Sequence, residues 1–210
     1  MAATVVKICG INDPAAMAAA AAAGADFVGF VFFAPSPRAV SPARAAAIAA
    51  PGPAKVGLFV DPTDEAIATV LAALKLDLIQ LHGEETPARC AAVKARFGIP
   101  VMKALGIAGP ADLARLGDFA PVVDRFLLDA KALPGASLPG GNAAPFDWTL
   151  TAGVAVPRPW LLAGGLTPDN VAEAIAVSGA PGVDVSSGVE KARGAKDPAR
   201  IAAFVAAARG

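Results

Sequence analysis

Residues 160–188 read WLLAGGLTPDNVAEAIAVSGAPGVDVSSG, a succession of apolar run, helical pattern and second apolar run. The runs Trp160–Ala163 and Val183–Ser186 are typical of buried strands. Between them, the spacing of apolar residues predicts a helix over Thr167–Ser178, in which a capping threonine precedes a proline suited to the first turn. Gly179 then follows the helix, where a left-handed residue is favoured. This stretch therefore predicts one β-α-β unit of a parallel sheet.

The same alternation runs along the whole chain. Six further strands are predicted at Val5–Cys9, Phe27–Phe33, Lys55–Val60, Leu78–Leu81, Val101–Leu105 and Phe126–Asp129. Six further helices are predicted at Pro14–Ala23, Pro42–Ala50, Thr63–Leu74, Pro87–Phe97, Ala111–Phe119 and Pro198–Ala208, with a weaker helical turn after Phe146. Eight strand-then-helix units within 210 residues predict a small single-domain (β/α)8 TIM barrel over residues 1–210. A doubly wound open sheet is the alternative, but it usually has only about five or six strands.

Composition narrows the classes of function. Hydrophobic residues make up 55% of the chain and the formal net charge is zero, which argues against a disordered chain and against a nucleic-acid binder. The two cysteines cannot form a disulfide framework, and no Cys/His spacing resembles a zinc site. The alanine-rich runs are too weakly apolar for a membrane span, and the start lacks the pattern of a signal peptide. We therefore expect a soluble, cytoplasmic protein with a small-molecule partner and neither a metal nor a membrane partner.

Barrel enzymes carry their active sites at the C-terminal ends of the strands. In this chain those ends and the loops after them carry a thiol, carboxylates and an arginine, together with small and polar residues: Cys9, Arg38, Asp61, Gln80, His82, Lys103, Asp129, Gly164, Gly165, Asp184, Ser186, Ser187 and Gly188. Apolar or small residues would fill most of these positions in a purely structural barrel. The set therefore indicates one functional mouth.

Two loops at this mouth predict a phosphate site. Gly164 and Gly165 precede a helix after the seventh strand, and Ser186, Ser187 and Gly188 follow the eighth. Glycines let main-chain N–H groups approach an anion, and barrels frequently bind phosphate at this place. An ordinary turn would explain either cluster alone, whereas both together favour phosphate binding.

A thiol and a carboxyl group are the candidates for proton transfer. Cys9 shares strand parity with Lys7, and a lowered thiol pKa would make it a base or a nucleophile. Cys90, in contrast, is expected to be a small buried hydrophobe. Asp129 follows an apolar strand whose desolvated flank favours the protonated form and suits general acid work, with a loop cap as the alternative. His82, the single histidine, is either a base or a hydrogen-bonded residue of the rim.

These residues stand in segments that together resemble the phosphoribosylanthranilate isomerase family. The segments are Lys7–Ile11, Gly29–Phe32 with Ser36–Arg38, Gln80–Glu84, Leu127–Asp129, Phe146–Trp148, Leu162–Leu166 with Asn170–Val171, and Val183–Glu190. They occur in the family's order at matching intervals over nearly the whole chain. Taken singly each segment is weak, but the ordered set is highly specific.

The resemblance implies an isomerase of the third stage of tryptophan biosynthesis from chorismate. It would convert N-(5-phosphoribosyl)anthranilate to 1-(2-carboxyphenylamino)-1-deoxyribulose 5-phosphate by an Amadori rearrangement, without a metal or other cofactor, as a monomer or weak homodimer. By this resemblance Cys9 is the general base, Asp129 the general acid, and Arg38 faces the anthranilate carboxylate. The further substrate contacts would be His82, Asp184, Gly164, Gly165, Ser186, Ser187 and Gly188. The chain departs from the family in residues 140–145, Gly-Gly-Asn-Ala-Ala-Pro, where the usual lysine and a glycine are missing.

Two other classes of function fit parts of the pattern. A Schiff-base aldolase would use Lys103 at the fifth strand as its nucleophile. A non-catalytic barrel could bind a phosphorylated ligand, although such a protein has no need for both Cys9 and Asp129. Borohydride trapping and a turnover assay, respectively, distinguish these classes from an isomerase.

Overall fold

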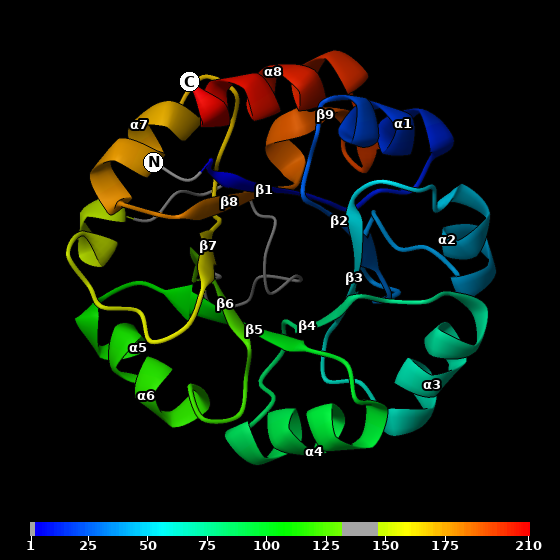
Figure 1. Ribbon diagram of the computed structural model, residues 1–210, viewed down its shortest axis with the longest axis horizontal. Helices are drawn as coiled ribbons and strands as arrows, with labels where there is room; N and C mark the ends of the chain where they lie inside the picture. The colour runs from blue at the N-terminus through cyan, green and yellow to red at the C-terminus, as the bar shows by residue number, and fades with distance from the viewer. Residues whose placement is uncertain (1–2, 132–146) are drawn as a thin grey trace.

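Eight parallel strands close into a barrel in which each strand pairs with the next along the chain and the last pairs with the first (Figure 1). The computed structural model describes residues 3–131 and 147–210. The strands are β1 (Val5–Cys9), β2 (Phe27–Val31), β3 (Ala54–Phe59), β4 (Leu78–Leu81), β5 (Val101–Ile107), β6 (Arg125–Ala130), β7 (Trp160–Leu162) and β8 (Gly182–Val185). The predicted (β/α)8 barrel is confirmed, and the open-sheet alternative is wrong.

Helices surround the barrel on its outside (Figure 1). They are α1 (Pro14–Ala22), α2 (Pro42–Ile48), α3 (Asp64–Ala73), α4 (Pro87–Phe97), α5 (Pro110–Ala114), α6 (Leu116–Phe119), α7 (Val171–Ser178) and α8 (Pro198–Arg209). The side chains of Asp13, Ser41, Thr86 and Asp197 accept main-chain hydrogen bonds at the starts of four of them, each before a proline. Gly98 and Gly179 end α4 and α7 in the predicted left-handed conformation.

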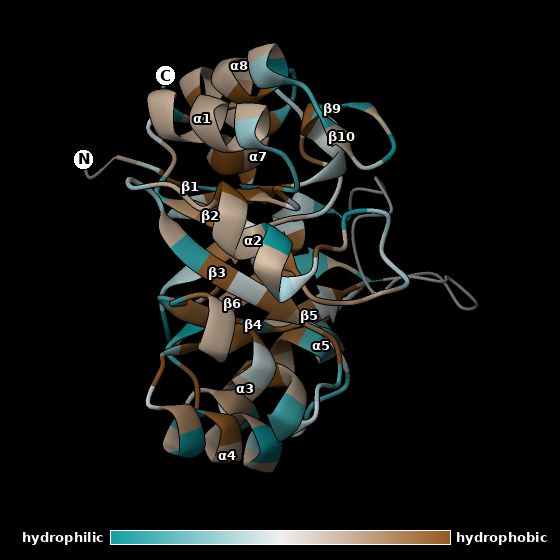
Figure 2. Ribbon diagram, turned by 90° about the vertical axis from the view of Figure 1, so that its right-hand side faces the viewer, coloured by the Kyte–Doolittle hydropathy of each residue, from teal (hydrophilic) through white to brown (hydrophobic). Residues whose placement is uncertain are grey.

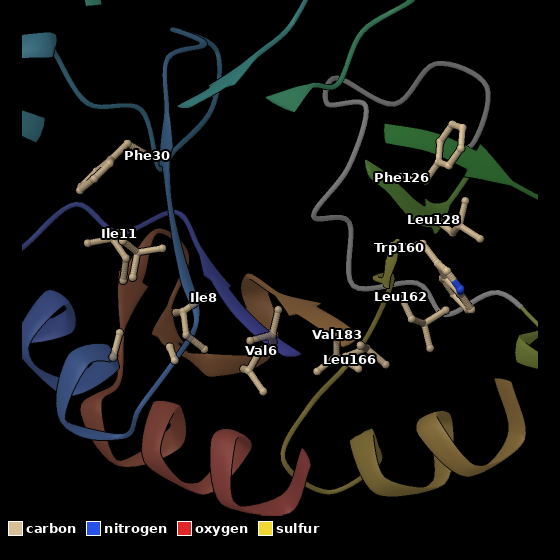
Figure 3. Close-up of a cluster of buried hydrophobic side chains, with 14 of the residues drawn as sticks. Val6, Ile8, Ile11, Phe30, Phe126, Leu128, Trp160, Leu162, Leu166 and Val183 are labelled. Atoms are coloured by element: carbon tan, nitrogen blue, oxygen red, sulfur yellow. The ribbon is translucent and has the colours of Figure 1, made fainter. Parts of the chain in front are cut away.

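Alternation along each strand separates two apolar layers. Val6 and Ile8 of β1 point outward into the core between the strands and the helices, as Figure 3 shows for this side of the barrel. The opposite parity fills the barrel interior with a second cluster: Val56, Leu78, Met102, Ala104, Leu127, Leu161 and Ala163. Lys7 and Cys9 alternate with Val6 and Ile8, so their side chains belong to the interior side.

Two predicted helices differ in the structure. The predicted helix over 111–119 is two short helices, α5 and α6, whereas the weaker helical turn predicted after Phe146 is present as the 3-10 turn η1 (Trp148–Thr151). Helix α7 begins at Val171 rather than Thr167, because the Asn170 side chain accepts a 2.8 Å hydrogen bond from the Thr167 N–H and holds the preceding residues in a turn. The predicted loop Ala130–Pro145, with its altered segment, lies almost entirely outside the described residues.

An antiparallel hairpin that the sequence did not predict follows β8. A 3-10 turn, η2 (Ser187–Val189), leads into β9 (Glu190–Ala192) and β10 (Ala195–Lys196). Figure 2 shows this hairpin at the end of the barrel away from both chain termini. That is the end reached by the C-terminal ends of the strands, so the hairpin lies where the site was predicted. No helix in the described part of the chain is long and apolar enough to cross a membrane.

Candidate active site

Four strands carry predicted polar residues at positions whose side chains point into the barrel, and these residues meet at one mouth. Cys9 ends β1, His82 directly follows β4, Asp129 lies near the end of β6, and Asp184 lies in β8. In the closed strand order, β1 and β6 are separated by β7 and β8 on the shorter side, so the thiol and the carboxyl group enter the mouth from different sides. Cys90 instead lies fully buried in the outer core, as predicted.

The Cys9 thiol occupies a space that a glycine keeps open. Cys9 is 4% exposed and pairs in register with Gly29 of β2. A Cβ on Gly29 would lie 3.0 Å from Cys9 Sγ and 3.2 Å from Lys7 Nζ. Burial raises the pKa of the Cys9 thiol, although the positive charges of Lys7 and Lys196 act in the opposite direction. Lys7 and Lys196 are therefore the groups that oppose the effect of burial on this thiol.

Lys7 forms a buried ion pair with Asp184. Lys7 Nζ donates a 2.8 Å hydrogen bond to Asp184 Oδ1, and the two residues are register partners across β1 and β8. Burial alone would lower the pKa of Lys7, but the negative charge of Asp184 and the proximity of Cys9 outweigh it and raise the pKa above its ordinary value. Lys7 is therefore a permanent cation beside the thiol, a feature that the sequence analysis missed although parity with Cys9 was visible.

Asp129 is joined by the single histidine. His82 Nε2 lies 3.4 Å from Asp129 Oδ2, and the other ring nitrogen, Nδ1, lies 3.0 Å from Gln80 Nε2. As placed, the Gln80 amide donates to Nδ1, which leaves the ring proton on Nε2, facing the carboxylate. Within the described part of the chain, Gln80 Oε1 is buried without a hydrogen-bond partner. The structure thus places the His82 ring beside the Asp129 carboxyl group.

The β9–β10 hairpin binds the predicted carboxylate-recognising arginine. Arg38 Nε and Nη2 donate to the two carboxylate oxygens of Glu190 at 2.6 and 3.1 Å, and Lys196 Nζ donates to Glu190 Oε1 at 3.0 Å. Burial would raise the pKa of Glu190, yet the hydrogen bond from Arg38 and the charge of Lys196 hold it below the ordinary value. Burial also lowers the pKa of Lys196, against the attraction of Glu190. After its two bonds to Glu190, Arg38 retains the two N–H donors of Nη1 and the second N–H of Nη2.

The two glycine loops after β7 and β8 touch each other. Gly164 and Gly165 have φ angles of 88° and 65°, the left-handed region that favours glycine. A Cβ on Gly188 would overlap the carbonyl oxygen of Leu166, so the loops pack backbone against backbone. Within the described residues, the N–H groups of Gly164 and Gly165 have no acceptor. Main-chain N–H groups of this kind can bind an anion.

Lys103 does not belong to this mouth. It shares parity with Val101 and Leu105, whose side chains lie in the outer core. Its ammonium donates to the Gly83 carbonyl at 2.6 Å and to Glu85 Oε2 at 2.7 Å, and the residue is 1% exposed. A lysine that is buried outside the barrel and already paired cannot attack a carbonyl bound at the mouth. The aldolase alternative therefore loses its nucleophile.

A closed (β/α)8 barrel with titratable groups gathered at the C-terminal ends of its strands is the architecture of a barrel enzyme. Among the described residues no group of three or more His, Cys, Asp or Glu side chains is arranged to hold a metal ion. Comparison with known proteins specifies the class further. The family model described as N-(5'-phosphoribosyl)anthranilate (PRA) isomerase matches residues 6–207.

Individual relatives agree with the family model. The N-(5'-phosphoribosyl)anthranilate isomerase of Paracoccus denitrificans is 61% identical over 97% of this chain and 96% of its own length. The crystal structure of the phosphoribosyl anthranilate isomerase of Thermotoga maritima superposes with a TM-score of 0.88 at 37% identity, covering 99% of both chains. A further structure of that enzyme type, in complex with reduced 1-(o-carboxyphenylamino)-1-deoxyribulose 5-phosphate, has a TM-score of 0.83 at 36% identity over 99% of both chains. The chain belongs to the N-(5'-phosphoribosyl)anthranilate isomerase family, and it is an isomerase of tryptophan biosynthesis.

Proposed function

We propose that the barrel mouth converts N-(5'-phosphoribosyl)anthranilate to 1-(2-carboxyphenylamino)-1-deoxyribulose 5-phosphate with Cys9 as the general base and Asp129 as the general acid. One observation carries the proposal: in a chain of this family, the thiol and the carboxyl group lie on interior positions of β1 and β6 and enter the mouth from different sides. An Amadori rearrangement needs a proton donor and a proton acceptor on opposite sides of the ribose.

The chemistry assigns the two groups in sequence. Asp129 donates its proton to the furanose ring oxygen, so the bond from that oxygen to C1 breaks and an iminium forms. The thiolate of Cys9 then removes the proton from C2, and the electron pair of that bond neutralises the iminium to give an enolamine. The enolamine gains a proton at C1 and loses its hydroxyl proton at C2, which yields the ketone. Neither group changes its oxidation state.

The remaining residues bind the two ends of the substrate. Gly164 and Gly165, with Ser186, Ser187 and Gly188, bind the phosphate through main-chain donors and the small space between the loops. Arg38 reaches the anthranilate carboxylate through its free Nη1 edge, while Glu190 fixes its plane. His82 and Asp184 contribute at the ribose, each already oriented by its partner in the free site.

The proposal extends to assembly and location. One relative's structure is described as monomers generated from a dimeric isomerase, so the family includes both states. We expect this chain to be a monomer or weak homodimer, which sedimentation at several concentrations measures. The two buried, unpaired cysteines suit a reducing compartment, and we expect the enzyme to act in the cytoplasm.

A fluorescence assay that follows the loss of phosphoribosylanthranilate tests the proposed function. We expect the purified chain to consume the substrate, and we expect Asp129→Asn to lose turnover while it still binds the reduced product analogue. Weak binding of that analogue by a folded Asp129→Asn would make Asp129 a ligand contact instead of the acid. No consumption by the unaltered chain would contradict the assignment as a whole.

A further inference from the structure

The proposed mechanism leaves one buried cation of the barrel interior without a role. Lys7 is 0% exposed and precedes Cys9 by two residues on β1, so both side chains point to the same interior side. An isolated ammonium group in such a place is costly, and Asp184 compensates its charge through the 2.8 Å hydrogen bond. An apolar pair would fill the same volume without this cost, so the ion pair calls for another explanation.

The ammonium group of Lys7 lies close to the sulfur of Cys9. Both atoms approach the same point above Gly29, the sulfur at 3.0 Å and Nζ at 3.2 Å from the position of a glycine Cβ. An ammonium has three donors, and Asp184 accepts one of them. The absent side chain of Gly29 thus leaves room for a donor and an acceptor to meet in the barrel interior.

We propose that Lys7 is a positioning residue for the base: its ammonium group donates to the Cys9 sulfur and stabilises the thiolate, while Asp184 holds the ammonium in place. The inference rests on the proposed role of Cys9 as the general base. When Cys9 takes the proton from C2 it becomes a neutral thiol, and Lys7 then returns to its pairing with Asp184 alone. No covalent or redox step is involved.

The charges that face Cys9 act in defined directions. Lys7 from β1 and Lys196 from β10 favour the thiolate, whereas burial and the negative charge of Asp184 from β8 favour the thiol. Lys196 pairs with Glu190, which also pairs with Arg38. The Glu190 carboxylate therefore compensates much of the positive charge of Lys196. Lys7 is the cation on the same strand as the thiol, and its influence should therefore dominate on the thiolate side.

Titration of the thiol tests this role without using activity. The thiolate absorbs near 240 nm, and the chain contains no tyrosine whose phenolate would add to the signal in the alkaline range. Burial raises the pKa of Cys90 to about 11, so a Cys90→Ala background removes the second thiol. In that background we expect Lys7→Met to raise the pKa of Cys9 enough to lower the thiolate fraction at a given pH by about tenfold or more, and Lys7→Arg to restore most of it.

Two further variants make the result specific. Lys103→Met removes a buried, paired lysine from the outside of the barrel and should leave the Cys9 titration unchanged. Asp184→Asn removes the negative charge beside Lys7 and should shift the titration toward lower pH, opposite to Lys7→Met. In activity, Lys7→Met should lower kcat more than it changes KM, and the loss should diminish as the pH rises.

The outcomes separate the two assignments. A folded Lys7→Met whose Cys9 titrates as in the parent overturns the role of Lys7, and so does an equal shift in Lys103→Met. If Lys7→Met does not fold, Asp184→Asn decides: a shift toward lower pH supports the coupling of the three groups, and no shift overturns it. Ordinary turnover by Cys9→Ala would remove the base itself, a result that is independent of how the thiol titrates.

Discussion

Gly165 is a residue of the proposed phosphate site whose backbone conformation favours a glycine. Its φ of 65° strains any residue with a Cβ, so a substitution would shift the main-chain N–H groups of this loop. We expect Gly165→Ala to raise KM with little change in kcat, because it hinders binding in the ground state and the transition state alike. Gly98→Ala is the matched control, since Gly98 has a φ of 64° and open space around it at the end of α4. An unchanged KM in a folded Gly165→Ala would remove this anchor from the account.

At the residue scale, the sequence predicted which side chains reach the mouth but not how they pair. Cys9, Asp129 and Asp184 follow from their positions at strand ends, which the alternation locates. The pairing of Lys7 with Asp184 joins residues 177 positions apart and depends on the β1–β8 register, which no local pattern contains. The error at Lys103 was avoidable, because its parity with Val101 and Leu105 already places it on the outer side.

The β9–β10 hairpin connects to the β2–α2 loop and acts as a clamp on it. Glu190 connects Arg38, Lys196 and the Gly194 N–H, and Asn12 Nδ2 donates to the Gly194 carbonyl at 2.8 Å. The short strands of the hairpin have no periodicity that could be recognised in the sequence, which explains why it was missed. Its residues Val189 and Glu190 were recognised only as the end of a family segment.

Replacing Glu190 by Gln should loosen this clamp in a pH-dependent way. The pKa of Glu190 lies below the ordinary 4.5, so its stabilising contribution is fully present above that value and is lost as the pH falls through the lowered pKa. We expect Glu190→Gln to lower the free energy of unfolding by about 2 kcal/mol at neutral pH, at the lower end for a buried ionic contact because the amide can still accept. Denaturant unfolding from pH 7 to 3 measures this, and a difference from wild type that does not shrink below pH 4.5 would contradict it.

The pair of Lys103 and Glu85 connects β5 to the loop after β4 on the outer side of the barrel. Glu85 also accepts from the N–H groups of Asp61 and Gly83, so the pair closes the turns after β3 and β4. We expect Lys103→Met to lower the free energy of unfolding by about 3–5 kcal/mol, because it leaves a buried carboxylate unpaired, with no loss of kcat. Loss of turnover with stability retained, or borohydride trapping of Lys103 with a sugar phosphate, would restore the aldolase alternative.

For the whole molecule, eight local strand-and-helix signals were enough to predict the barrel. Periodicity marks the β-α units, and several also have a capping residue before a proline or a glycine at the helix end; α4 has both, from Thr86 to Gly98. Closure of the barrel then follows from the number of strands. The weakest signal lay between β6 and β7, where the described residues form the 3-10 turn η1.

Closure also brings Cys9 and Asp129, the proposed base and acid, to one mouth, and the proposed proton transfer depends on this arrangement. The most direct measurement is kcat for phosphoribosylanthranilate in Cys9→Ala, with Cys90→Ala as the matched control for loss of a buried thiol. We predict that Cys9→Ala lowers kcat by about 10²–10⁴-fold with substrate-analogue binding retained, and that Cys90→Ala keeps wild-type turnover. Combined with Asp129→Asn, the loss should be far smaller than the product of the two separate losses, because both groups serve one proton-transfer sequence. Ordinary turnover in a folded Cys9→Ala would contradict the account.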